Sequence, residues 1–124
     1  MSEKTLEKIA EYTAIPEKEW RWLGVAGHFI SSARCQFSLH TEVGNYIIST
    51  IGEMIVDGEP MDVGRGKYET MIFETCFRCT APGCNCDYPL HTGQQLNTKH
   101  CNTRAEAQEQ HLAECRRVAN GGTP

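Results

Sequence analysis

The sequence predicts an α+β domain with an N-terminal helix, an antiparallel sheet of three to five strands, a zinc-binding loop and a C-terminal helix packed on the sheet. Three observations lead to this prediction. Apolar and polar residues alternate in parts of 23–76, as in half-buried strands. A cysteine-rich loop, 77–102, follows, and 103–119 opens with a helix-capping pattern. Residues 1–22 form the remaining, helical segment of this single domain.

The composition is that of a small globular protein. The chain has 124 residues, of which 40% are hydrophobic and 23% are charged, a size that supports one modest core. No apolar run approaches the roughly 20 residues that span a bilayer, and no apolar segment follows Met1, so we expect a cytoplasmic protein without a membrane partner. The formal net charge of −4 makes duplex nucleic acid an unfavourable partner.

The first segment is predicted to be helical. Residues 3–13 place apolar side chains on one helical face, and Pro16 suits the first turn of a further helix through 17–22. Trp20 and Trp22 are too close in sequence to share one helical face. We therefore expect one tryptophan to pack in the core and the other to face a partner or a groove.

A β-hairpin is predicted next, over residues 34–51. In 34–41, Cys35, Phe37 and Leu39 share one face of the strand. The residues that alternate with them, among them His40, form the polar face. Residues 43–45 have turn chemistry and 46–51 reads as the returning strand. Gly52 is expected to allow a bend before a short strand segment at 54–56.

The second half begins with a turn at 57–60 and a loop that continues to Gly66. A third strong strand, 68–75, then enters the cysteine cluster. Residues 87–102 have no convincing period, so an irregular loop is expected there. Thr103 and Glu106 have capping-box spacing, which predicts a helix that ends near 120–122.

Four cysteines lie within residues 76–86, and this spacing predicts structural zinc. An odd total of seven cysteines, in a protein expected in a reducing cytosol, argues against a disulfide framework. The ion would attach the last helix to the sheet and take no part in chemistry. The predicted ligands are Cys79, Cys84, Cys86 and Cys115, with His111 and Cys76 as alternatives for the uncertain position.

Several aromatic and polar residues are predicted to line a pocket on one sheet face. Aromatic rings and arginines suit a nucleotide-like ligand, through stacking and charge-assisted bonds to phosphate. An ordinary polar outer face is the alternative. No catalytic residue is assigned, because Cys35 falls on the core face and no nucleophile or phosphate-loop motif occurs. The predicted ligand-binding residues are His28, Arg34, Arg65, Tyr68, Glu69 and Trp22.

The stretches 24–30 and 34–37, 49–52, and 64–71 resemble a group of short proteins encoded by tailed phages and prophages. Residues 79–86 and a late His-x3-Cys are similar to one branch of that group. The resemblance implies a phage source and carries over no catalytic residue. Short accessory phage proteins are often counter-defence factors, which either inhibit a host immune protein or sequester its nucleotide signal.

The expected function is therefore that of a counter-defence binding protein in the cytoplasm of the infected host. It would sequester a nucleotide-like signal in the sheet-face pocket. One alternative is a zinc-stabilised adaptor that binds a host defence protein through Trp20 or Trp22. A second is a small nucleotide-processing enzyme. Homo-oligomer formation stays open.

Overall fold

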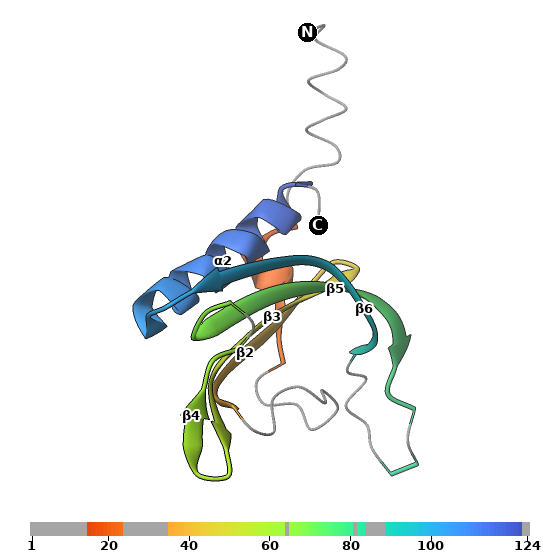
Figure 1. Cartoon of the computed structure of the whole chain (residues 1–124). Coiled ribbons are helices and arrows are strands. Elements are labelled where there is room, and N and C mark those ends of the chain that lie inside the picture. The colour runs from red at the N-terminus through yellow and green to blue at the C-terminus, as the bar shows by residue number, and fades with distance from the viewer. Residues whose placement is uncertain (1–14, 24–34, 64, 81, 84–88, 123–124) are drawn as a thin grey trace, which may run out of the picture.

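In the computed structural model, the described residues form a single antiparallel sheet with one α-helix packed on it (Figure 1). No helix among the described residues is both long and apolar enough to cross a membrane. The N-terminal helix predicted over 3–13 lies outside the described residues. The structure describes residues 15–23, 35–63, 65–80, 82–83 and 89–122.

The sheet has six strands in the order β1-β2-β3-β5-β6, with β4 paired to β3 off this path. All neighbouring strands are antiparallel. The sheet therefore reaches beyond residue 76, where the sequence placed its end. The elements are the 3-10 helix η1 (Glu17–Glu19), β1 (Arg21–Trp22), β2 (Cys35–Val43), β3 (Tyr46–Val56), β4 (Glu59–Met61), β5 (Tyr68–Arg78), β6 (Pro89–Cys101) and α2 (Arg104–Ala119).

The prediction of a helix over residues 17–22 is wrong beyond its first turn. Helical structure ends at Glu19, and Trp22 lies in β1, paired with Thr41. Trp20 packs against the core, and its Nε1 atom donates a hydrogen bond of 3.0 Å to the carbonyl oxygen of Ile15. The indole is thus anchored to the backbone just before η1.

The predicted β2–β3 hairpin is confirmed, and the bend in β3 is present. β3 pairs with β5 up to Gly52 and with β4 from Met54 onward. Glu53, between them, has a φ of 55°. The predicted turn at Asp57 and Gly58 closes a second hairpin, with φ angles of 52° and 81°. These left-handed angles match the twist of a two-residue hairpin turn.

The prediction of an irregular loop over 87–102 is wrong, because β6 occupies most of this range. β6 is an edge strand, so backbone hydrogen bonds to β5 support it on one side, and most of its side chains are polar. Its pairing with β5 also shifts register between Ile72 and Phe77. The many polar side chains and the shifted register leave no regular alternation of apolar and polar residues. That alternation is the pattern by which a strand is recognised in a sequence.

Helix α2 begins and ends where predicted. Thr103 Oγ1 accepts a 3.1 Å hydrogen bond from the backbone N–H of Glu106 and donates one of 2.8 Å to its carboxylate. Gly121 follows the helix with a φ of 80°. The face that α2 turns to the sheet is buried and consists of Ala107, His111, Glu114, Cys115, Val118 and Ala119.

Apolar residues pack on both faces of the sheet. On the α2 side, Val43, Ile48 and Ile72 form a core cluster with Cys115 and Val118. On the other side Ile51, Met71 and Phe73 are buried. His40, expected on a polar face, is fully buried on this second side. The sheet is therefore covered on both faces along β2, which alternation alone does not reveal.

A buried polar network lies at the centre of the contact between α2 and the sheet. His111 Nε2 lies 2.8 Å from Thr41 Oγ1, and His111 Nδ1 lies 2.8 Å from Thr50 Oγ1. Thr70 Oγ1 continues the chain, 2.8 Å from Thr50 Oγ1. Burial, and then the charge of His40, lowers the pKa of His111 to about 3. The ring is therefore neutral at pH 7.

Acidification should destabilise the protein through His111. Its pKa is about 3 when folded and 6.5 otherwise, so between these values the unfolded chain binds a proton that the folded chain does not. Stability then falls as pH drops below 6.5, by about 2 kcal/mol between pH 7 and pH 5. Urea denaturation at both pH values measures this loss. The loss should shrink in His111→Gln, and an undiminished loss in that variant would assign it to another group.

Candidate ligand-binding site

The predicted ligand-binding residues lie in different parts of the structure. His28 and Arg34 are outside the described residues. Arg65 is exposed in the turn before β5. Tyr68 and Glu69 are neighbours in β5 and face opposite sides of the sheet, because strand side chains alternate. Tyr68 and Glu69 therefore cannot line the same pocket on one face of the sheet.

Glu69 and Trp22 each have a separate environment. Glu69 lies on the sheet face away from α2, with its Oε2 atom 3.3 Å from His100 Nε2. Trp22 is 57% exposed on β1, and its ring meets that of His111 edge-on, at 6.2 Å between centroids. Trp20 packs on the core, as expected for one of the two tryptophans, and a partner at Trp22 stays a prediction.

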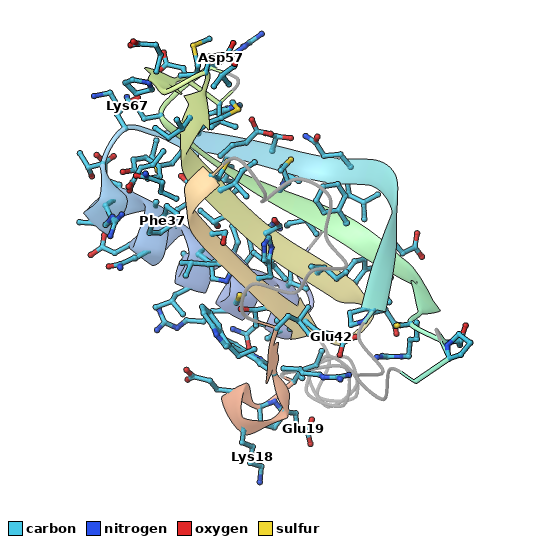
Figure 2. All side chains as sticks on the ribbon, turned by 90° about the horizontal axis from the view of Figure 1, so that it is seen from below. Lys18, Glu19, Phe37, Glu42, Asp57 and Lys67 are labelled. Atoms are coloured by element: carbon cyan, nitrogen blue, oxygen red, sulfur yellow. The ribbon has the colours of Figure 1, made fainter. Side chains whose placement is uncertain are left out.

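A cavity of about 430 Å³ opens beside Tyr68, between the β3–β4 hairpin and the start of β5. Its volume lies in the range of roughly 300–1,000 Å³ of small-molecule sites. Figure 2 shows Lys67, a lining residue, at the same end of the molecule as the hairpin residue Asp57, with Lys18 and Glu19 at the other end. The lining residues are Gln36, Glu53, Ile55, Pro60, Met61, Asp62, Lys67 and Tyr68.

The wall of this cavity contains a hydrogen-bonded group of Glu53, Tyr68 and Arg104. The Tyr68 hydroxyl donates to Glu53 Oε2 at 2.8 Å. Arg104 donates to the same carboxylate twice, from Nε to Oε2 at 2.8 Å and from Nη2 to Oε1 at 2.6 Å. This bidentate pairing connects the first residue of α2 to the bend in β3.

The bend in β3 places the Glu53 carboxylate in this group. Gly52 shares a row with Phe37 and Tyr68, so strand alternation would turn Glu53 to the opposite face. The φ of 55° breaks the alternation and brings the carboxylate to Arg104 instead. A side chain in this conformation costs roughly 1–2 kcal/mol. Strain of this kind is typical of functional sites.

Gly52 provides the space for the Tyr68 ring. A Cβ atom at Gly52 would lie 2.1 Å from Tyr68 Cδ1, which is closer than any real contact. The ring then meets Phe37 edge-on, with 5.3 Å between centroids, and the Arg104 guanidinium lies 5.4 Å from the Phe37 centroid. These contacts hold Tyr68 and Arg104 in place.

The pKa values of Glu53 and Tyr68 are shifted in opposite directions. Hydrogen bonds from Arg104, and then from Tyr68, lower the pKa of Glu53. Burial, and then the Glu53 carboxylate, raises the pKa of Tyr68. At neutral pH the site therefore holds an ionised carboxylate and a protonated phenol. Both oxygens of the Glu53 carboxylate accept hydrogen bonds, which fix this side chain in the wall of the cavity.

The predicted zinc ligands are only partly described. Cys84 and Cys86 lie outside the described residues, and Cys79 is partly exposed just after β5. Cys115 is fully buried in the core, and burial raises its pKa to about 12. His111 uses both ring nitrogens in the threonine network. Within the described ranges, no three His, Cys, Asp or Glu side chains gather as a metal site would require. Zinc in the loop stays a prediction.

Of the residues at this cavity, Tyr68 was a candidate from the sequence, whereas Glu53, Arg104 and Asp62 were not. Two signals of the cavity are present in the sequence, the glycine at position 52 and the turn at 57–60. A bend in a strand followed by a hairpin can form one wall of a cavity. Arg104 gave no signal, because its pairing with Glu53 spans 51 residues of sequence.

Residues from three separate stretches of the sequence meet at this site. Residues 34–37, 49–52 and 64–71 contribute Phe37, Gly52 and Tyr68, which are paired across β2, β3 and β5. Fold and site thus define a small α+β domain with a preformed cavity. No protein-family model, curated protein or solved structure matches this chain.

Replacing Arg104 should raise the pKa of the Glu53 carboxyl group. In Arg104→Gln we expect the pKa of Glu53 to rise toward 4.5, because hydrogen bonds from Arg104 are the main cause of its depression. A pH titration of the Glu53 carboxyl ¹³C shift measures it. Arg116→Gln, a substitution at an exposed residue near the other end of α2, is the matched control. An unchanged pKa in Arg104→Gln would refute the pairing.

Proposed function

We propose that this protein is a binding protein that sequesters a nucleotide-like small molecule in the cavity beside Tyr68. By the resemblance to short phage proteins, it acts in counter-defence in the cytoplasm of the infected host. The observation that carries the proposal is the cavity itself, with a rigid polar wall at Glu53 and apolar side chains around it.

Binding is favoured over catalysis by the state of Glu53. A general base must be free to accept a proton from a substrate or water. Both oxygens of Glu53 already accept hydrogen bonds, and the low pKa of the group weakens it further as a base. The carboxylate is better suited to fixing the shape of the wall.

A nucleotide-like ligand is favoured by the rest of the lining. Pro60, Met61 and the Tyr68 ring offer apolar surface to a planar base. Lys67 is exposed beside them and provides a point charge for phosphate. Apolar walls with a few polar groups are usual in small-molecule sites.

Native mass spectrometry of the purified protein tests the proposal. A nucleotide-sized adduct should appear in the intact spectrum and disappear after denaturation. Met61→Trp, which fills the cavity, should lose the adduct. Leu112→Trp, at an exposed position on α2, should keep it. If wild type carries no adduct and a panel of nucleotides leaves its Tm unchanged, the proposal fails.

We also propose that zinc holds the loop after β5 through Cys76, Cys79, Cys84 and Cys86. The fourth ligand is Cys76, because Cys115 belongs to the core cluster with Val43, Ile48 and Ile72. Cys76 lies in β5 and Cys79 directly follows that strand, and two residues separate them, a spacing that is common among zinc ligands. Such an ion stabilises a loop that is too short to form a core.

Substituting a loop cysteine should remove the metal. Cys84→Ser is expected to lose bound zinc and to lower Tm, because three thiolates hold the ion less well than four. Zinc is quantified by elemental analysis of the purified proteins. Cys35→Ser, in β2, should retain it. Equal zinc in the two variants, or none in wild type, would contradict the site.

A second function, binding to a host defence protein, is favoured by one observation. Trp22 is 57% exposed on edge strand β1, and Leu112 is 39% exposed on α2. Trp22 contacts His111, and Leu112 is the next residue along α2. Exposed tryptophan is frequent at the centre of protein interfaces.

A further inference from the structure

Three polar side chains line the cavity without a polar partner among the described residues. Gln36, Asp62 and Lys67 line it and are exposed. In the part of the chain that the structure describes, none of their side chains takes part in a hydrogen bond or ion pair. Glu53, the other polar lining group apart from the Tyr68 hydroxyl, is already engaged by Arg104. The groups left for a ligand are thus a carboxamide, a carboxylate and an ammonium.

The charges of these groups limit the ligand. Arg104 balances Glu53, which leaves one negative charge at Asp62 and one positive charge at Lys67. A ligand that matches them has hydrogen-bond donors for the carboxylate and one anionic group for the ammonium. Further phosphates would meet the carboxylates of Asp62 and Glu53. A single phosphate is therefore favoured over a triphosphate.

An aspartate also discriminates among the bases. An ionised carboxylate only accepts hydrogen bonds, through two oxygens side by side. Guanine alone among the common bases has two adjacent donors on its pairing edge, N1–H and the N2 amino group. Adenine and cytosine place one donor beside a ring acceptor, and uracil flanks its N–H with two carbonyl oxygens. Each of these acceptors would face a carboxylate oxygen with no proton between them.

We propose that the cavity binds a guanine mononucleotide. Asp62 accepts from guanine N1–H and N2, Gln36 donates its amide N–H to O6, and Lys67 binds the single phosphate. Met61 and Tyr68 bound the base on its apolar faces. This inference rests on the proposed function and specifies its ligand.

Exchanging the carboxylate for a carboxamide should reverse the preference. Wild type should bind GMP at least about tenfold more tightly than AMP in titration calorimetry, because a bidentate contact discriminates between bases. In Asp62→Asn, one oxygen acceptor and one N–H donor match N6 and N1 of adenine, so AMP should become the tighter ligand. Asp57→Asn, at the hairpin tip seen in Figure 2, should keep the wild-type preference.

The lysine is tested with and without phosphate. Lys67→Gln should weaken GMP about tenfold, as expected for a charge-assisted bond, and should leave guanosine unchanged. Lys18→Gln, at the opposite end of the molecule in Figure 2, should change neither. A mutated protein that has unfolded would lose both ligands, so these selective effects report on the site itself.

The outcomes separate the inference from the proposed function. A reversal in Asp62→Asn with a phosphate-specific loss in Lys67→Gln supports the guanine site. Equal binding of GMP and AMP, or the same change in Asp57→Asn as in Asp62→Asn, overturns it and leaves nucleotide binding intact. If no nucleotide binds wild type, both the inference and the proposed nucleotide function fail.

Discussion

The position of α2 on the sheet depends on a polar contact at the centre of an otherwise apolar interface. His111 bonds to Thr41 and Thr50 at 2.8 Å each, with apolar clusters toward both ends of the helix. Apolar packing alone tolerates sliding of a helix along a sheet. A buried ring that needs two hydroxyl partners does not, because a shift would leave its polar atoms unsatisfied. The network therefore sets the register of α2.

That register determines the geometry of the cavity wall. Arg104 and His111 are seven residues apart on one helix, or about 10 Å along its axis. Fixing the ring of His111 thus fixes where the guanidinium of Arg104 meets the bend in β3. Glu53 and Tyr68 complete the wall through hydrogen bonds to each other and to Arg104. Because α2 carries both His111 and Arg104, the packing of the core determines the orientation of the cavity wall.

Local signals in the sequence predicted the elements whose neighbours are close in the chain. The β2–β3 hairpin, the turn at Asp57 and the capping box of α2 depend on contacts within a few residues, and all three are confirmed. β6 was missed because its support comes from backbone bonds to β5, which leave no pattern in side chains. The Glu53–Arg104 pair was missed because only the folded sheet brings it together.

The bend at Glu53 divides the molecule into a part that is packed and a part that can vary. Beyond it, β3 has lost its pairing with β5, keeps one pair with β2 at Met54 and Cys35, and otherwise pairs with the short strand β4, whose residues are all exposed. One wall of the cavity thus includes the exposed residues Pro60 and Met61 of β4, and the other includes Tyr68, which is hydrogen-bonded through Glu53 to α2. Substitutions in the hairpin can change the shape and charge of the cavity with little effect on folding. A protein built this way can follow a changing ligand during evolution while keeping the same scaffold.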